Sequence, residues 1–538
     1  MIPSSSAMPS SRPTALLFLL LFLASLSLTS SASNSYPNFT TDHQHQLCKT
    51  TPFPDLCLDS LKLSISIDTS ILSCILRSLD SAISAVSSLS PLISNPAIVE
   101  SQRGALLDCR ELHNATLSSL CRSSSLLRSS SSRAVADART HLSAALTNRD
   151  TCLQGLVGSH GRQAADLVTA WNAAYKYVSN ALSLVSHSGG NVHRRRLLSA
   201  RGFPRWLGRR ERRLLESGDY TASAVVTVAA DGSGNFTTVG DAVAFAPNNS
   251  AERTVIMVRA GVYDENVDIA GYKTNIALLG EGSDVTFIRG SRSVGDGWTT
   301  FRSATVAVAG EGFLARDLTI QNIAGPEKYQ AVALRINADF SAVYLCTIDG
   351  YQDTLYAHSF RQFYRECNVF GTIDFVFGNA AAVFQATNLV AKKPMSGQYN
   401  VITSQARDDP DEVTGFSIQN CSVLASDDFA ANIGDTKTYL GRPWRLYSTT
   451  VFIESYIDDL VDPAGWIQFS PDRGDEGLDT LYYGEYMNSG PGAAVDNRVT
   501  WPGFHLMQYE DAYNFTVSVF IYGDMWLDSL SVPYDDGV

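Results

Sequence analysis

The sequence lacks the motifs of two kinds of hydrolytic centre. No Gly-x-Ser-x-Gly segment occurs among its 538 residues, which argues against a serine hydrolase built on a nucleophile elbow. Its nine histidines and nine cysteines are scattered, and no group of them has the spacing of metal ligands. We therefore expect no metal and no other cofactor.

Basic residues are scarce in the second part of the chain. Residues 217–538 contain 19 lysines and arginines against 41 acidic residues, a net charge of −22. The residues before them carry a net charge of +9, so the whole-chain value of −13 hides two parts of opposite sign. Nucleic-acid binding depends on neutralising phosphates with basic residues, so no nucleic-acid partner is expected.

Long apolar runs are also missing, except at the N-terminus. Arg12 precedes an apolar stretch from Ala15 to Leu28, and the small residues at 30–32 follow it, which predicts a cleaved signal peptide over residues 1–32. The stretch is short for a membrane span, so an uncleaved anchor is the weaker alternative. No later stretch is expected to span a bilayer, so the product is expected outside the cell. Six Asn-x-Ser/Thr triplets agree with export: Asn38, Asn114, Asn235, Asn248, Asn420 and Asn514.

Residues 40–188 predict an all-α domain. Leu, Ala and Ser dominate, and apolar residues recur at intervals of three and four, as in Leu72, Ile75, Leu76 and Leu79. Prolines cluster near 52–54 and 91–96 and are absent from the long segments after them. This pattern favours an antiparallel helix bundle.

The cysteines of this domain fall into two pairs and a remainder. Cys48 and Cys57 lie nine residues apart around a Pro-rich turn, close enough for a local bridge, while Cys109 and Cys152 sit on separate helical segments that a second bridge could tie. The pattern resembles the plant invertase and pectin methylesterase inhibitor family. That resemblance implies a four-helix bundle with those two bridges, acting by covering an esterase cleft. The remaining cysteines, Cys74 and Cys121, are expected to be buried free thiols.

Residues 189–218 are expected to form a basic linker. The segment turns abruptly to Gly, Pro and Arg and has no sustained apolar period. Two copies of Arg-Arg-Leu-Leu stand out, one starting with Arg195 and Arg196 and the other with Arg212 and Arg213. Solvated linker charge and a phosphate-binding patch are alternatives, but exposure between two domains favours cleavage by a processing protease.

Residues 219–538 predict an all-β domain of stacked coils. Short β-rich runs, such as Thr254 to Val258 and Ile276 to Leu279, are broken by Gly and Asn. One half-motif recurs, and aligning its copies makes residues 317, 346, 367, 387 and 421 equivalent, with separations of 29, 21, 20 and 34 residues. Irregular spacing with a floor near twenty is typical of a parallel β-helix. A sandwich is the weaker alternative, because hairpin-type turns are few.

Two acids occupy matching places in this pattern. Asp353 follows Cys346 by seven residues, and Asp374 follows Cys367 by seven, so both should lie at equivalent positions on adjacent coils, roughly 4.8 Å apart. Each is set among Gly, aromatic and amide residues rather than other charges. Asp beside Gly also suits a tight turn, which is the alternative for either residue alone. Two carboxylates this close cannot both ionise readily, so their pKa values should separate.

Five ordered motifs in this half resemble those of the pectin methylesterases. They are GVYDE at 261–265, QAVAL at 330–334, GYQDT at 350–354, GTIDFVFG at 371–378 and LGRPW at 440–444. The resemblance covers nearly everything after residue 217 and implies a right-handed parallel β-helix. GVYDE is expected to be structural.

The resemblance also implies a role for each site residue. Asp374 would be the nucleophile on the methyl ester of galacturonate, and Asp353 the acid and then the base. Gln330 and Gln352 would stabilise the oxyanion, and Arg442 would hold Asp374. The expected substrate contacts are Thr300, Gln330, Tyr356, Phe377, Arg442 and Trp444.

Three other functional classes fit the sequence less well. A pectate lyase or polygalacturonase would need a calcium-binding acid cluster or an Asp trio, and neither is present. A non-catalytic pectin-binding β-helix protein would have lost an acid, and a pure inhibitor would end near residue 190. The partners implied are methyl-esterified homogalacturonan, a processing protease and separate inhibitor proteins, for a monomeric enzyme of the cell wall.

The thiols of the second half leave two outcomes open. In the family a disulfide joins the position of Cys367 to the next coil, where this chain has Thr387. Cys346 holds the equivalent place on the preceding coil, within disulfide range of Cys367 by the strand spacing. We expect either a Cys346–Cys367 bridge or two buried free thiols, with Cys421 too far away to take part.

Overall fold

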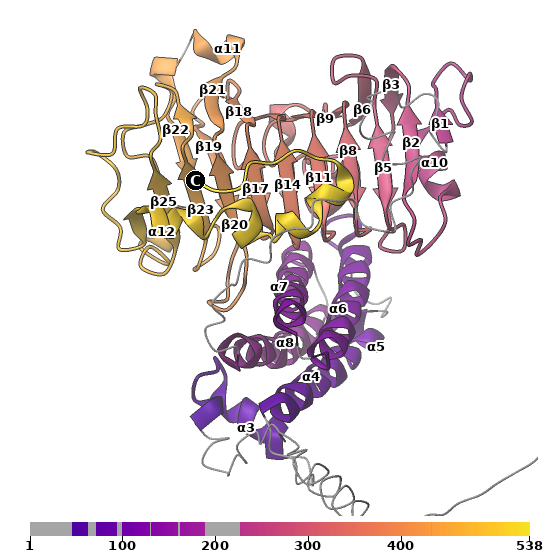
Figure 1. Ribbon diagram of the computed structural model, residues 1–538, viewed down its shortest axis with the longest axis vertical. Helices are drawn as coiled ribbons and strands as arrows, with labels where there is room; N and C mark the ends of the chain where they lie inside the picture. Colours follow the sequence, from indigo (N-terminus) through magenta and orange to yellow (C-terminus); the bar gives the residue numbers. More distant parts are fainter. Residues whose placement is uncertain are drawn as a thin grey trace, which may run out of the picture.

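The chain folds into a helical part and a part made of parallel strands (Figure 1). The computed structural model describes residues 46–62, 71–93, 99–129, 131–159, 162–188, 226–431 and 433–538. The signal peptide and the linker with its Arg-Arg pairs at 195–196 and 212–213 were predicted in segments outside these residues.

The first part is an antiparallel bundle whose long helices are amphipathic, as the three-and-four periodicity predicts. Its helices are α3 (Pro54–Lys62), α4 (Ile71–Ser87), α5 (Ser90–Ile93), α6 (Ala105–Leu127), α7 (Ser132–Gly155) and α8 (Arg162–Ser188). Leu79, Leu142 and Trp171 are fully buried between them. The segment Leu72–Ile93 is long and apolar enough to span a membrane by length and composition, contrary to expectation, but its buried face belongs to the bundle core.

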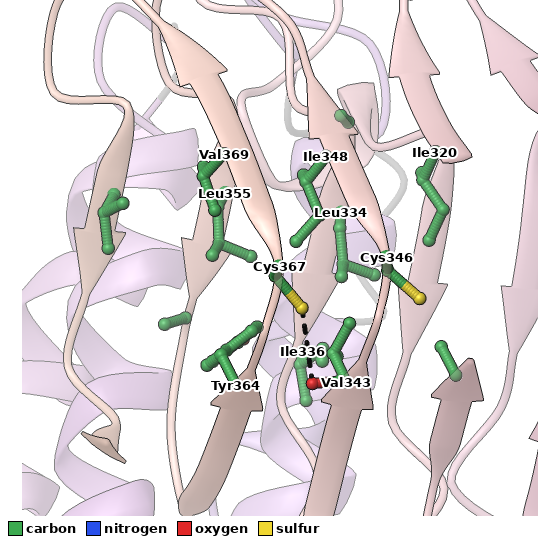
Figure 2. Packing of buried hydrophobic residues seen from close by; sticks show 14 of the residues in the cluster. Ile320, Leu334, Ile336, Val343, Cys346, Ile348, Leu355, Tyr364, Cys367 and Val369 are labelled. Atoms are coloured by element: carbon green, nitrogen blue, oxygen red, sulfur yellow. Dashed lines mark hydrogen bonds between the residues drawn. The ribbon is translucent and has the colours of Figure 1, made fainter. Parts of the chain in front are cut away.

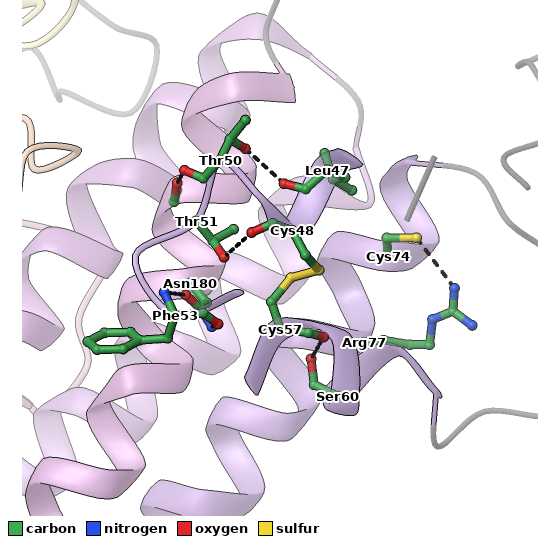
Figure 3. The surroundings of a disulfide bond; sticks show 11 residues. Leu47, Cys48, Thr50, Thr51, Phe53, Cys57, Ser60, Cys74, Arg77 and Asn180 are labelled. Carbon is green, nitrogen blue, oxygen red and sulfur yellow. Dashed lines mark hydrogen bonds between the residues drawn. A yellow bond between two sulfur atoms is a disulfide. The ribbon is translucent and has the colours of Figure 1, made fainter. Parts of the chain in front are cut away.

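Both expected bridges of the bundle are present. Cys48–Cys57 closes the Pro-rich turn before α3 (Figure 3), and Cys109–Cys152 joins α6 to α7. Cys74 is a buried free thiol, as expected. The same expectation for Cys121 was wrong: it is exposed on α6, because it follows the buried Leu120 and points away from the core face of the helix.

The second part is a parallel β-helix of three sheets, in which every strand pair is parallel. The largest sheet contains β1 (Val226–Val228), β2 (Thr254–Val258), β5 (Ile276–Leu279), β8 (Leu314–Arg316), β11 (Ser341–Tyr344), β14 (Arg361–Arg365), β17 (Ala381–Gln385), β20 (Gly415–Gln419), β23 (Thr449–Ile453), β25 (Tyr482–Tyr486) and β26 (Phe504–Leu506). The second contains β3 (Gly261–Asp264), β6 (Thr286–Gly290), β9 (Thr319–Asn322), β12 (Thr347–Asp349), β15 (Asn368–Gly371), β18 (Asn388–Ala391), β21 (Ser422–Ala425) and β24 (Tyr456–Ile457).

The third sheet carries the candidate site described below. Its strands are β4 (Val267–Ile269), β7 (Val306–Val308), β10 (Leu334–Ile336), β13 (Leu355–Ala357), β16 (Val376–Gly378), β19 (Asn400–Gln405) and β22 (Thr438–Gly441). Short helical turns and helices decorate the coils: α10 (Val239–Phe245), α11 (Asp427–Ala430), α12 (Tyr509–Tyr513) and α13 (Val517–Phe520).

The predicted coil register is correct for four of its five copies. Strand pairing makes Thr347 equivalent to Thr319 and to Asn368, so Leu318 rather than Asp317 matches Cys346, at a separation of 28 residues instead of 29. Each of the five aligned coils turns through one residue in the left-handed region just before this position, including Asp317 with φ 55°. The sequence alignment was wrong by one residue because it matched Asp317, the polar turn residue, to Cys346 in place of the buried Leu318 that follows it.

The two thiols in question lie inside the coil as free cysteines (Figure 2). Cys346 and Cys367 occupy equivalent, fully packed positions, and the Cys367 thiol donates to the Val343 carbonyl at 3.4 Å. Burial raises the pKa of the Cys367 thiol to about 12. Of the two outcomes left open, the structure has the buried free thiols.

The bundle packs against the β-helix through α6 and α7 (Figure 1). Phe301, Val332, Tyr356 and Phe377 of the β-helix belong to the same apolar cluster as the bundle core. The surface that the bundle covers is therefore the outer face of the third sheet.

Candidate active site

One row of side chains crosses the third sheet, and strand register defines it. Arg335 pairs with Tyr356, Tyr356 with Phe377, and Phe377 with Ser404 on successive strands β10, β13, β16 and β19. Alternate residues of a strand face the same side, so these four side chains share one face of the sheet. Asp268 of β4 stands in the same row, two coils before Arg335.

Asp353 and Asp374 lie beside this row on adjacent coils. Each is two residues before its strand, and Leu355 pairs with Val376, so the two acids are equivalent in register, as predicted. The Asp353 amide donates to the Ile373 carbonyl at 3.0 Å, which links the two turns directly. Both acids have left-handed backbones, with φ 62° and 51°, a conformation that Asp tolerates better than most residues.

Arg442 grips Asp374 with two hydrogen bonds. Its Nε donates to Oδ1 at 2.8 Å, and its Nη2 donates to Oδ2 at 2.6 Å. Arg442 follows β22 and is further held by the Phe469 carbonyl, which accepts from Nη1 at 3.0 Å. Burial works against the charge of Arg442, but the Asp374 carboxylate more than offsets it and raises the pKa of Arg442. A bidentate pair of this kind stabilises the ionised carboxylate.

Asp353 has no such cation of its own. Burial and the nearby charge of Asp374 raise the pKa of Asp353 well above its ordinary value, and Arg442 opposes them only in part. One member of the pair is thus equipped to carry a negative charge and the other to carry a proton. That division suits nucleophilic catalysis combined with general acid catalysis.

A cavity of about 190 Å³ opens over the two acids. Its lining includes all nine residues for which catalytic or substrate contacts were predicted: Thr300, Gln330, Gln352, Asp353, Tyr356, Asp374, Phe377, Arg442 and Trp444. They come from five different coils, so only the stacking of the coils brings them together. Their chemical roles stay predictions.

Aromatic rings form one wall of this cavity. Tyr356 and Phe377 are stacked with centroids 4.1 Å apart, and Phe377 lies 5.9 Å from Trp444. Phe301 meets Tyr356 edge to face at 6.4 Å. Flat apolar faces of this kind accommodate sugar rings.

The sequence analysis missed several residues of the cavity. Ser404 and Phe469 were absent from the prediction, although the pairing of Ser404 with Phe377 follows once the register is known. Phe301 adjoins the predicted Thr300 and was also passed over. No local signal marked Phe469, which contacts Arg442 from a loop 27 residues further along the chain.

The bundle contributes the remaining wall. Gln102, Asp108, Thr151, Gln154 and Gly155 line the same cavity as the two acids. The Thr151 hydroxyl lies 3.4 Å from the Tyr356 hydroxyl and 2.9 Å from His358 Nε2. The bundle therefore sits directly over the candidate site.

Two further expectations concern the surroundings of the site. Among the residues that the structure describes, no group of three or more His, Cys, Asp and Glu side chains could hold a metal ion. The GVYDE segment has structural contacts: Glu265 accepts from the Val239 and Gly240 amides at 2.7 and 2.9 Å, at the start of α10.

Comparisons with known proteins match both parts of the chain. The pectinesterase family matches residues 225–524, and the plant invertase/pectin methylesterase inhibitor family matches residues 43–184. A probable pectinesterase/pectinesterase inhibitor 12 of Arabidopsis thaliana is 54% identical over 99% of this chain and 100% of its own length. A pectinesterase/pectinesterase inhibitor of Ficus pumila var. awkeotsang is 42% identical over 96% of each chain.

Solved structures match the β-helix. A pectin methylesterase from carrot superposes with a TM-score of 0.58 and 50% identity over 59% of this chain and 99% of its own. A deglycosylated pectin methylesterase from Aspergillus niger gives a TM-score of 0.50 and 29% identity over 57% of this chain and 96% of its own. The expected fold is confirmed by these structures.

Proposed function

Because the chain belongs to the pectinesterase family and acts on the methyl esters of pectin, we propose that Asp374 is its nucleophile and Asp353 its acid and base. The observation that carries this proposal is the asymmetry of the pair. Arg442 binds both oxygens of Asp374, whereas the pKa of Asp353 is raised by burial and by its neighbour's charge. Two equal carboxylates could not divide the two tasks.

The first half-reaction forms a covalent intermediate. A carboxylate oxygen of Asp374 attacks the ester carbonyl carbon on C6 of galacturonate, and the carbonyl electrons move onto oxygen. The bond to the methoxy oxygen then breaks, and Asp353 gives its proton to that oxygen to release methanol. Asp374 is left as an acyl anhydride with the sugar, and Asp353 is left ionised.

The developing oxyanion needs hydrogen-bond donors. The side-chain amides of Gln330 and Gln352 line the cavity next to the acids and suit this purpose. A single well-aimed donor of this kind typically contributes about 3 kcal/mol to transition-state stabilisation.

The second half-reaction restores the enzyme. Asp353, now ionised, takes a proton from water, and the hydroxide oxygen attacks the acyl carbon of the intermediate. The bond to Asp374 breaks, which returns the nucleophile to its two hydrogen bonds with Arg442 and frees galacturonic acid, whose carboxyl proton is lost to solvent. Asp353 is protonated again and ready for the next ester.

The bundle is proposed to be an autoinhibitory pro-region. The support for this role is that Thr151 and Gln154 line the cavity that the substrate would have to enter. Secretion to the cell wall after loss of residues 1–32, and cleavage within 189–218, stay predictions that accompany this role. N-terminal sequencing of the secreted product tests both.

Methanol release from esterified pectin tests the proposed chemistry. The full chain is cut in the 189–218 linker, freed of its bundle, and assayed beside the uncut chain. Asp374→Asn is expected to abolish turnover, and Asp353→Asn is expected to bind substrate but lose most of the rate. Asp349→Asn is the matched control, because Asp349 lies on the same coil as Asp353 but pairs with Lys392 on another sheet. Near-normal turnover in either site variant would refute the assignment, and equal rates before and after cutting would refute autoinhibition.

A further inference from the structure

Two threonines of α7, one helical turn apart, present their hydroxyl oxygens to the β-helix. Thr147 and Thr151 each donate their single hydroxyl proton to the carbonyl four residues earlier in the helix, at 3.1 Å. Towards the β-helix these oxygens can therefore only accept hydrogen bonds. The Asn379 side-chain amide donates to Thr147 at 2.9 Å, and His358 Nε2 lies 2.9 Å from the Thr151 oxygen. The same Asn379 amide also donates to Glu412 of the β-helix at 3.0 Å, so only part of its donor capacity is directed at the bundle.

His358 is a neutral hydrogen-bond donor at this contact. Since Thr151 gives its proton to its own helix, the proton of the contact lies on His358 Nε2, and Nδ1 accepts from the Ser359 hydroxyl at 2.9 Å. Burial and the charge of Arg335 lower the pKa of His358 well below its ordinary value, in agreement with a single ring proton. Removal of the bundle would free this N–H to bond another acceptor.

Ser404 is a third polar group on this wall, and contact with the bundle does not account for it. Its side chain is buried and lines the cavity that holds the two acids. Its hydroxyl has no hydrogen-bond partner among the described residues. Because a buried hydroxyl without a partner is costly, this group points to a ligand that supplies the missing bond.

The three groups lie around the aromatic wall on the sides away from the acids. Asp353 and Asp374 come two residues before β13 and β16, whereas His358 and Asn379 come directly after the same two strands. The stacked rings of β13 and β16 lie between these two edges of the sheet. Ser404 follows in the same row as the rings, one coil further along.

A galacturonate ring placed on this wall has one possible orientation for reaction. Its ester is at C6, on one edge of the ring, and its free secondary hydroxyls, O2 and O3, are on the opposite edge. When the ester faces the acids, O2 and O3 therefore face His358 and Asn379.

We infer that His358, Asn379 and Ser404 form a hydroxyl site, which binds the free secondary hydroxyl groups of the pectin chain. The inference rests on the proposed function and adds to it the polar contacts that orient the sugar. While the bundle is docked, Thr147 and Thr151 present hydroxyl oxygens in place of those of the sugar. Ser404 gains its bond only from the substrate.

The test measures methanol release from a fully methyl-esterified galacturonate oligomer. The freed enzyme is obtained by cutting the folded full chain in the linker, and kcat and KM are determined separately. Ser404→Ala removes only the hydroxyl, so the fold should be retained. Loss of one hydrogen bond between neutral groups is expected to raise KM about fivefold, and kcat should change by less than about twofold.

Two substitutions test His358. His358→Phe keeps a flat ring but removes both nitrogens, and it should also raise KM about fivefold. His358→Gln keeps an N–H donor of similar reach and should restore most of the wild-type KM. Ser417→Ala is the matched control, because this buried serine lies on β20 of the first sheet, where its hydroxyl donates to the Phe515 carbonyl at 2.8 Å, and its KM should equal that of wild type.

Docking of the bundle distinguishes the two kinds of group. The dissociation constant of the bundle from the cut chain should rise about fivefold in His358→Phe and in Thr151→Val, because each removes one partner of the same hydrogen bond. It should change by less than about twofold in Ser404→Ala, since that hydroxyl has no bond to the described residues of the bundle.

Each outcome bears on one claim. An unchanged KM in Ser404→Ala or His358→Phe, or a loss confined to kcat, would overturn the hydroxyl site and leave the esterase function standing; Ser404→Ala decides the question if His358→Phe does not fold. Unchanged docking in Thr151→Val would overturn the claim that the bundle occupies part of this site. Failure of wild type to release methanol would refute the proposed function itself, and the hydroxyl site with it.

Discussion

Asp108 should make the docking of the bundle on the cleft weaker as the pH rises. Burial in the docked state raises the pKa of Asp108 from 3.8 to about 6, although Arg302, the Thr299 hydroxyl and Arg335 all oppose this shift. In the undocked bundle the β-helix no longer covers this carboxyl, so its pKa should return towards the ordinary value of 3.8. The docked state therefore binds the proton more tightly than the undocked state.

The sign and size of the effect follow from this difference. The contribution of Asp108 to docking is largest below pH 4, where Asp108 is protonated in both states, and it weakens as the pH rises towards 6. His141 and His358 act in the opposite direction, because burial lowers the pKa values of these two histidines at the same interface. A shift of about two pKa units corresponds to about 3 kcal/mol, or a change of roughly 150-fold in the dissociation constant. Asp150 on α7 acts in the same direction, because burial also raises its pKa to about 6 against the pull of Arg445 and Arg149.

The assay uses the full chain after a cut in the linker. The dissociation constant of the bundle is measured by calorimetry between pH 4 and 7, in buffers of different ionisation enthalpy. Near pH 5 docking should take up about one proton through Asp108, and Asp108→Asn should lose that uptake and flatten the pH dependence. Asp80→Asn is the control, since Asp80 is exposed on α4. Unchanged pH dependence, or unchanged proton uptake near pH 5, in Asp108→Asn would refute the reasoning.

Two shorter predictions concern Arg442 and the free thiols. Arg442→Lys should lower kcat of the freed enzyme by about a hundredfold with little change in KM, because an ammonium cannot bond both oxygens of Asp374 at once; a rate near wild type in the methanol assay would contradict this. The unreduced, unfolded chain should titrate five thiols, and alkylation of the folded chain should label Cys121 alone. A Cys346–Cys367 cross-linked peptide in mass spectrometry would contradict the second prediction.

The pairing of the acids was predictable because the chain repeats evenly at that point. Cys346 to Cys367 and Asp353 to Asp374 are both separated by 21 residues, so no insertion disturbs the stacking between these two coils. Once the coils stack, adjacency follows from the strand spacing alone. The one-residue error at Asp317 has the opposite cause. The coil between Leu318 and Cys346 is longer, so its alignment with the next coil depended on a short motif that fits in two registers.

The docking of the bundle was not predictable in the same way. Asp108 and Glu111 are ordinary members of an amphipathic helix in sequence, and no periodicity reveals that they face arginines nearly 200 residues away. The prediction that Cys121 is buried was wrong for a related reason, since the sequence does not show which face of the helix an unpaired cysteine occupies. The apolar periodicity of a helix indicates only which face is buried. It does not indicate which surface of another domain packs against that face.

The charge of the bundle itself is close to zero. Residues 40–188 contain 12 basic and 11 acidic residues, a net charge of +1, because most of the +9 before residue 217 belongs to the linker. At the buried contacts the bundle supplies acids and the β-helix arginines, as in the pair of Asp137 with Arg361 at 2.8 Å, whereas at an exposed contact Arg122 of the bundle pairs with Glu311 at 2.7 Å. Salt at 0.1 M screens exposed charges beyond about 10 Å but acts weakly on buried pairs. Association of the two parts should therefore depend only weakly on ionic strength, while the pH dependence of docking is determined by the few titratable groups buried at the cleft.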